Sequence, residues 1–143
     1  MKRKEVIQKA WTNYLHVRGM KEFRVIITGA ASFNQYGLLG TKCRKILSRV
    51  INKPDTEVII LSGRYSGAEQ LGLQWARENH LKTEVFENIE NLPFKEAETN
   101  RCQRMIDAAD ALIAFDWPPY PNWHMLKLVD GAAKKGIPYR VIG

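Results

Sequence analysis

Residues 61–76, LSGRYSGAEQLGLQWA, contain the residue types from which a chain can build an anion-binding loop. Gly63 and Gly67 stand between an apolar run and the start of an amphipathic segment. Glycines at a strand-to-helix junction allow backbone N–H groups to converge, and the following helix adds partial positive charge at its N-terminus. Arg64 lies between the glycines, and a guanidinium binds phosphate through two parallel hydrogen bonds. The sequence therefore predicts an anion site formed by Arg64 and the N–H groups of residues 66–68.

Ser66 and Glu69 in the same stretch have a second interpretation. A serine followed three residues later by a glutamate has the spacing of a capping box, which does no more than begin a helix. In a basic loop, however, Glu69 would have a lowered pKa and could act as a general base. The glycines do not follow the G-x-G-x-x-G pattern, and no G-K-[ST] of a Walker loop follows them. Capping and ligand binding both remain open for Ser66, Ala68 and Glu69.

The stretch TGAASF, which follows the apolar run of residues 24–28, offers a second set of polar groups. Thr28 and Ser32 carry hydroxyls, and Gly29 would let a ligand approach the backbone closely. Phe33 could stack on a base or fill the core. We include all four residues in the candidate site.

Two further stretches carry candidate ligand contacts. In ETNRCQRMIDAAD, Arg101 and Arg104 are three residues apart and therefore share one face of a predicted helix. They would contact a phosphate or carboxylate, or form ion pairs with Glu96 or Glu98. FDWPPYPNWH contains Asp116 and several aromatic residues, which could stack on a base, cap the core or form a dimer contact: Trp117, Tyr120, Trp123 and His124.

The elements that must position these residues alternate along the chain. Short apolar runs predict strands at 24–28, 57–61, 82–87, 111–115 and 138–142. Apolar residues at helical spacing predict helices at 36–51, 67–79, 97–109 and 123–135, with a loop over 88–98. This alternation predicts an α/β, Rossmann-like, doubly wound and mostly parallel sheet of about five strands, with helices on both faces. Ligands of such sheets bind outside the carboxyl ends of the strands, where the candidate residues lie.

The N-terminal segment lies outside this alternation. Residues 3–18 have apolar positions at helical spacing (Val6, Ile7, Ala10, Trp11, Tyr14 and Leu15), followed by Gly19. We expect an amphipathic helix within an appended segment of residues 1–22, and a single domain over residues 23–143. Trp11 would pack on this domain or on a second copy in a homo-oligomer.

The bulk composition limits the class of protein. The chain has 143 residues, a formal charge of +7 and a pI of about 9.5, which favours anionic partners or simply maintains solubility. It contains no apolar run of membrane-spanning length, and its basic N-terminus lacks the features of a secretory signal. Cys43 and Cys102 show no metal-ligand spacing. We expect a cytoplasmic protein that binds no metal.

The stretches RVIITGAASF, VIILSGRYSGAEQLGLQWARENHLKTEVF and NRCQRMIDAADALIAF together resemble the SLOG superfamily of Rossmann-like proteins. Within it they resemble the small YspA/CpYpsA-related branch, common in bacteria and phages. The resemblance covers roughly residues 23–143. It implies loops that bind nucleotides, a nucleotide or ADP-ribose-like ligand as the only expected cofactor, and contacts from Thr28, Gly29, Phe33, Gly63, Gly67, Ala68, Glu69, Arg101 and Arg104.

The chain departs from the family pattern at several positions. Ala30 and Ala31 replace a glycine and an arginine of the first motif, Arg64 replaces a small residue of the second, and Cys102 replaces the asparagine of the third. The loop after the fourth strand lacks the P-G-G-x-G-T-x-x-E stretch of LOG phosphoribohydrolases. We therefore expect nucleotide binding, with glycosidic hydrolysis by Glu69 or DprA-like binding of single-stranded nucleic acid as alternatives.

Overall fold

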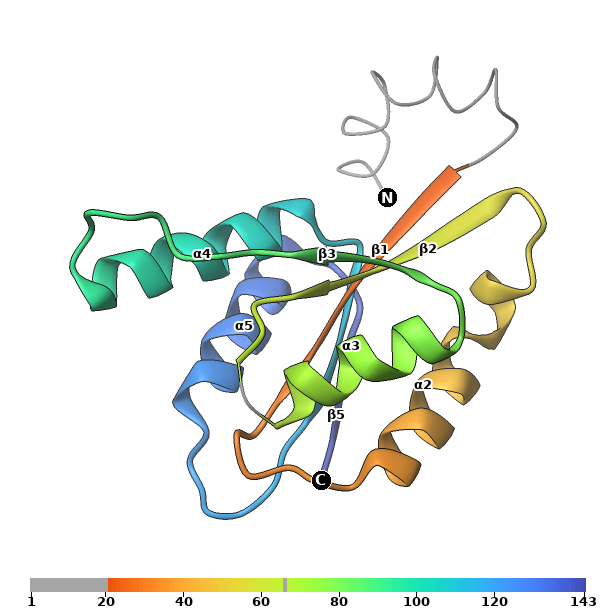
Figure 1. Cartoon of the computed structure of the whole chain (residues 1–143), viewed down its shortest axis with the longest axis horizontal. Coiled ribbons are helices and arrows are strands. Elements are labelled where there is room, and N and C mark those ends of the chain that lie inside the picture. The colour runs from red at the N-terminus through yellow and green to blue at the C-terminus, as the bar shows by residue number, and fades with distance from the viewer. Residues whose placement is uncertain (1–20, 66) are drawn as a thin grey trace.

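The computed structural model describes residues 21–65 and 67–143, and shows strands alternating with helices (Figure 1). The strands are β1 (Lys21–Gly29), β2 (Thr56–Ser62), β3 (Lys82–Val85), β4 (Ala111–Phe115) and β5 (Tyr139–Ile142). The helices are α2 (Tyr36–Ile51), α3 (Ala68–Glu78), α4 (Phe94–Ala108) and α5 (Trp123–Lys135). The expected N-terminal helix at 3–18 and the expected cap residue Ser66 lie outside the described residues.

The strands form one sheet in the order β3-β2-β1-β4-β5, and every neighbouring pair is parallel. The predicted Rossmann-like α/β fold is confirmed. The chain moves outward from β1 to β2 and β3, then crosses back through α4 to place β4 on the other side of β1. The strand order therefore reverses between β1 and β4, and their carboxyl ends flank the position where such sheets bind ligands.

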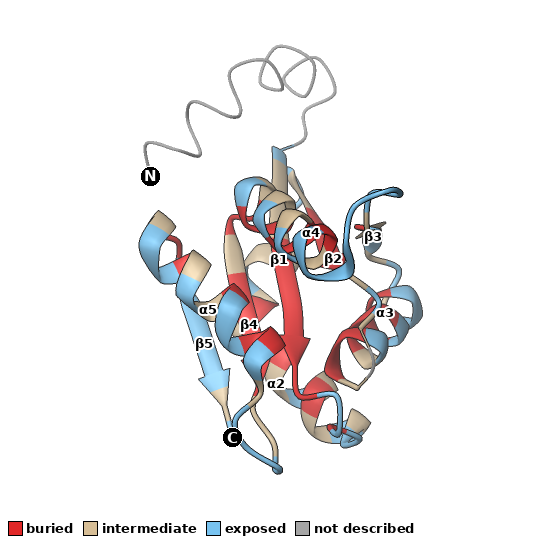
Figure 2. Cartoon of the chain, turned by 90° about the vertical axis from the view of Figure 1, so that its left-hand side faces the viewer, coloured by how far each residue is buried: buried red, intermediate tan, exposed pale blue. Residues whose placement is uncertain are grey.

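Helices cover both faces of the sheet. α2 and α3 pack on one face over a cluster that includes Leu39, Leu47 and Trp75, and α4 and α5 pack on the other over Met105 and Leu128. Figure 2 shows the buried carboxyl half of β1 in the centre of the domain and the exposed edge strand β5 at its side. The central strands are apolar on both faces because both faces are covered.

The largest differences from the sequence-based boundaries lie in β1, β3 and α4. β1 begins at Lys21, because Lys21–Phe23 pair with Thr56–Val58 of β2. β3 ends at Val85. α4 begins at Phe94, within the expected loop, directly after Pro93 at its N-cap. The helix start was missed because its first residues are polar or exposed, and Phe94 itself is 72% exposed.

Within the described part of the chain, every helix is too short or too polar to cross a membrane. The same residues contain no group of three or more His, Cys, Asp or Glu side chains arranged to hold a metal ion.

Candidate anion-binding site

The carboxylate of Glu69, in the first turn of α3, lies at the centre of the candidate site and is completely buried. Its Oε2 atom accepts hydrogen bonds from Thr28 Oγ1 at 2.7 Å and lies 2.6 Å from His124 Nε2. Its Oε1 atom accepts hydrogen bonds from the backbone N–H groups of Gly63 at 2.9 Å and Tyr65 at 3.2 Å. One side chain thus joins the end of β1, the loop after β2 and the start of α5.

These contacts determine the charge state of Glu69. Burial alone would raise the pKa of its carboxyl group, but the hydrogen bond and charge of His124 and the hydrogen bonds of Thr28 and Tyr65 hold the pKa below its ordinary value. Glu69 is therefore a carboxylate whose two oxygens are already engaged by four donors. In this arrangement the Glu69 side chain links the loop after β2 to Thr28 and His124.

The described contacts of Glu69 are not those of a capping box, whose other member, Ser66, lies outside the described residues. The N-cap of α3 is Gly67, which forms no side-chain cap bond. The Glu69 carboxylate instead reaches Gly63 and Tyr65, upstream of the helix. Gly67 has a φ of 74°, and a Cβ at this position would lie 2.2 Å from the carbonyl oxygen of Ala30. Glycine is therefore required where α3 begins against the loop after β1.

Four described backbone N–H groups in the loop after β2 and at the start of α3 donate to acceptors within the protein. Those of Gly63 and Tyr65 donate to Glu69, and that of Arg64 donates to Ser62 Oγ at 3.0 Å. The N–H of Ala68 donates to the carbonyl of Ala30 at 3.3 Å. Each of these groups therefore has an acceptor within the protein.

Arg64 lies at the surface of this loop. Its backbone has a φ of 57°, and its guanidinium forms an ion pair with Glu87, the residue that follows Phe86 after β3. The side chain is about half exposed, so the pair is solvated and can exchange Glu87 for another anion at little cost.

The guanidinium of Arg101 is buried, and two of its nitrogen atoms have no partner among the described residues. Its side chain extends from α4 to Gly63 and is only 8% exposed, and its Nε and Nη2 atoms are buried with no hydrogen-bond acceptor among the described residues. A Cβ on Gly63 would lie 3.1 Å from Arg101 Nε and 3.1 Å from Glu69 Oε1. Glycine at this position therefore leaves room for the guanidinium. Buried donors without acceptors are costly, and an anionic ligand would supply the missing acceptors.

His124 was identified from the sequence only among aromatic residues that could stack on a base, cap the core or form a dimer contact, and not as a partner of Glu69. It lies in the first turn of α5 and is 8% exposed. Its Nε2 atom contacts Glu69, and its Nδ1 atom is buried without a hydrogen-bond partner among the described residues, 3.8 Å from Glu98 Oε1. The Tyr65 ring stacks on its imidazole with centroids 4.1 Å apart. One feature of the sequence could have identified His124 as a site residue. It is a histidine that lies shortly after the carboxyl end of the strand predicted at 111–115.

Arg104 shares with Arg101 the expected face of α4. Its Nε donates to Asn100 Oδ1 at 2.8 Å, and its guanidinium also binds the backbone carbonyl of Glu87. Because α4 begins at Phe94, both arginines lie in the middle of the helix.

The remaining candidates belong to the loops after β1 and β4. Phe33 is 2% exposed and packs on Phe115 and Trp117, with ring centroids 5.0 and 5.2 Å apart, which favours its core interpretation. Ser32 Oγ donates to the carbonyl of Pro118 at 2.7 Å, and Asp116 accepts from Asn122 Nδ2 at 2.7 Å.

Gly29 allows strands β1 and β4 to pack closely. A Cβ there would lie 2.3 Å from the carbonyl oxygen of Phe115, so Gly29 allows the ends of β1 and β4 to approach. The structure thus brings four candidate residues together: Thr28, Gly63, Glu69 and Arg101. The other candidates make contacts within the loops after β1 and β4 and the strands before them: Gly29, Ser32, Phe33, Asp116 and Trp117.

Comparisons with known proteins identify a similar family and a similar fold. Residues 23–88 match the model of the YspA, cpYpsA-related SLOG family. Among solved structures, the chain resembles the X-ray structure of DNA processing protein A (DprA) from Streptococcus pneumoniae, with a TM-score of 0.62 and 12% sequence identity. The similarity covers 85% of this chain and 50% of that protein, so the chain spans half its length. No curated protein gives a significant sequence match.

The matched segment contains β1 to β3 and the glycine loop around Glu69, while the structural similarity extends over most of the chain. Residues 23–88, a little under half of the chain, are thus similar to the YspA, cpYpsA-related SLOG family, and the similarity to DprA shows the fold that the whole chain adopts.

Proposed function

We propose that the protein binds a phosphorylated, nucleotide-type ligand at the carboxyl edge of the sheet, beside the loop after β2. The observation that carries this proposal is the buried guanidinium of Arg101, with two nitrogen atoms that lack acceptors among the described residues. The similarity of residues 23–88 to the YspA, cpYpsA-related SLOG family, whose loops are expected to bind nucleotides, supports the same ligand class.

Three groups give the ligand its contacts in this proposal. Arg101 supplies the main hydrogen bonds to a phosphate, since its planar guanidinium matches two phosphate oxygens. His124 Nδ1, also buried without a partner in the described structure, supplies a further donor when it carries a proton. Arg64 exchanges its exposed pairing with Glu87 for a second anionic group of the ligand. A small movement of Tyr65, which covers His124, opens the route to these atoms.

Glu69 has a positioning role in this proposal. It holds Gly63, Tyr65 and His124 in place. Glycosidic hydrolysis by Glu69 has less support, because its carboxylate is buried and fully hydrogen-bonded.

Calorimetric titration with AMP, ADP-ribose, NAD and adenosine tests the proposal. We expect heat of binding with at least one phosphorylated compound and none with adenosine. Arg101→Gln should weaken that binding by about 10- to 100-fold, the value of one or more charged hydrogen bonds. The matched control is Arg44→Gln, because Arg44 is exposed on α2 and contacts Asn79. Equal affinity of Arg101→Gln and the wild type, or no binding of any phosphorylated compound, would contradict the proposal.

Single-stranded nucleic acid is a second candidate ligand. The fold similarity to a DNA processing protein and the formal charge of +7 favour it. Fluorescence anisotropy with a labelled oligonucleotide should then show affinity that falls steeply with salt. A Lys42→Ala, Lys45→Ala double variant should weaken it, and Arg101→Gln should not. The reverse pattern would identify the Arg101 site as the nucleotide site of the first proposal.

A further inference from the structure

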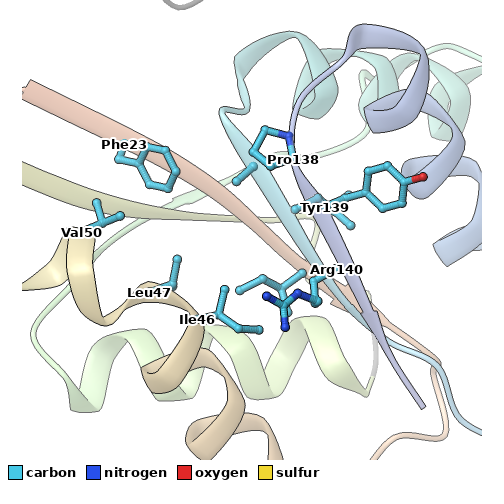
Figure 3. Close-up of a pocket in the computed structure, with 10 residues that line it drawn as sticks. Phe23, Ile46, Leu47, Val50, Pro138, Tyr139 and Arg140 are labelled. Atoms are coloured by element: carbon cyan, nitrogen blue, oxygen red, sulfur yellow. The ribbon is translucent and has the colours of Figure 1, made fainter. Parts of the chain in front are cut away.

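An apolar groove of about 220 Å³ lies far from the carboxyl-edge site, between α2 and the strands β4 and β5 (Figure 3). The side chains on its walls come from β1, α2, β4 and the residue before β5: Phe23, Ile46, Val50, Ala111, Ile113 and Pro138. Ile46, Val50 and Ala111 are half-buried and Pro138 is exposed. Arg140 is the one charged residue among those that line the groove.

The fold explains why this face is open. On the α2 face of the sheet, α2 and α3 pack mainly on β1, β2 and β3. The register pairs Ile113 with Arg140 and Phe115 with Ile142, so these residues of β4 and β5 share the face on which α2 lies. α5, which joins β4 to β5, packs on the opposite face. A sheet of this kind is normally covered on both faces, and one more helix would complete the layer that α2 and α3 begin.

The chain itself supplies a segment of the required kind. Residues 3–18 have six apolar positions at helical spacing and lie before β1, outside the described residues and outside the segment that matches the family. A helix of this length would extend about 24 Å, comparable with the length of a central strand. Only Gly19 and Met20 separate it from Lys21, so its end must lie within roughly 10 Å of the start of β1. Phe23, two residues into β1, already lines the groove.

A second hollow also lies close to the start of β1, where the segment of residues 3–18 ends, but it fits an apolar helix less well. It lies next to Thr56, the pairing partner of Lys21, and its lining includes Glu57, His80 and Lys82. Glu57 and Lys82 form an ion pair there at 3.2 Å. An apolar helix face would have to desolvate these charges, whereas the groove beside α2 has apolar walls.

We propose that the segment of residues 3–18 folds as an amphipathic helix and packs into the groove beside α2, in the same chain. Trp11 and its apolar neighbours then cover Ile46, Ala111 and Ile113. The segment acts as a cover for the open face of β4 and β5.

Hydrogen exchange of the full-length protein, followed by mass spectrometry, tests this packing. We expect amides of residues 6–15 to exchange about tenfold or more slowly than in an unfolded chain. Ile46→Glu places a charge on the groove wall and should remove this protection while leaving α5 protected. The matched control, Ile89→Glu, replaces an exposed isoleucine (47%) in the loop after β3 and should change nothing in residues 6–15.

Three results would overturn the proposal. The first is exchange of residues 6–15 at the unfolded rate in the wild type. The second is protection that survives both Ile46→Glu and Val50→Glu. The third is protection that appears only at concentrations where light scattering shows a dimer, which would assign the groove to a second copy.

Discussion

Glu69 and His124 meet at 2.6 Å across 55 residues of sequence, and this contact joins α3 to α5 over the carboxyl edge of the sheet. The histidine shares the Glu69 carboxylate with a threonine hydroxyl and two backbone N–H groups. Because both side chains are buried, the contact is shielded from solvent, unlike the exposed pair of Arg64 and Glu87. The stability of the loop after β2 therefore depends on one carboxylate.

We predict that Glu69→Ala destabilises the protein strongly. The variant leaves four donors without their acceptor in a buried site, and the loss of one partner of such a network costs about 3–5 kcal/mol. Urea denaturation followed by far-UV circular dichroism measures this change. Glu90→Ala, in the exposed loop after β3, is the control and should lie within about 0.5 kcal/mol of the wild type. A small effect of Glu69→Ala would show that the network contributes little.

The contribution of Glu69 should also depend on pH. Its pKa in the folded protein is lower than the ordinary 4.5, so the folded state binds its proton less readily than the unfolded state. The stabilisation by the carboxylate is therefore fully present above pH 4.5 and decreases as the pH falls towards the lowered pKa. The difference in free energy of unfolding between wild type and Glu69→Gln, measured by urea titration at several pH values, should shrink in acid. A difference that stays constant or grows as the pH falls would contradict the assigned charge state.

Arg101→Met should separate binding from stability. The substitution removes a buried guanidinium with unsatisfied nitrogens and keeps an unbranched side chain in its place. We expect the free energy of unfolding to stay equal or to rise by about 1–2 kcal/mol, while nucleotide binding is lost. Chemical denaturation and calorimetry on the same preparation measure both quantities. A loss of several kcal/mol would assign Arg101 a structural role instead.

Gly67→Ala should be far more damaging than alanine at an unobstructed glycine. A Cβ at residue 67 would meet the Ala30 carbonyl oxygen at 2.2 Å, and the backbone φ is 74°. We expect a loss of about 2 kcal/mol or more, seen as a lower melting temperature. Gly37 on α2 has nothing within 4 Å of the position of its Cβ, so Gly37→Ala should be neutral or stabilising by up to about 1 kcal/mol. Equal effects of the two substitutions would contradict the described packing of α3.

Both cysteines should resist thiol reagents in the folded protein. Burial raises the pKa of Cys43 to about 12, and burial raises that of Cys102 although the nearby charge of Arg101 opposes it. Only thiolates react readily, so Ellman's reagent at pH 8 should label neither cysteine until a denaturant is added. Rapid labelling of one thiol under native conditions would contradict this prediction, because it would show that the segment around that cysteine opens to solvent.

The sequence predicted the parts of the fold that follow from local periodicity. The bounds of α2, α5 and β4 agree with the structure, because their apolar residues recur at the spacing of a helix or fill a short continuous run. The start of α4 was predicted three residues too late, because its first turn is polar or exposed and leaves no periodic signal.

The candidate site was predicted only in part, because its contacts are not local. The glycine loop and Arg101 were identified from residue type and position after a strand. The spacing of Ser66 and Glu69 suggested helix capping, whereas burial beside Thr28 and His124 gives the Glu69 carboxylate other partners. No pattern in sequence shows that a histidine will meet a glutamate 55 residues earlier, because that meeting depends on the strand order.

The separation of these residues along the chain has a consequence for folding. Thr28 and Glu69 are 41 residues apart, and Glu69 and His124 are 55 residues apart, so the carboxylate network consists of contacts with high contact order. Such contacts form after local helices and turns, because closing long loops costs entropy first. During synthesis β1, β2 and β3 emerge before α5, and until then Glu69 lacks its histidine partner. The candidate site around Glu69 therefore forms as one of the last steps of folding.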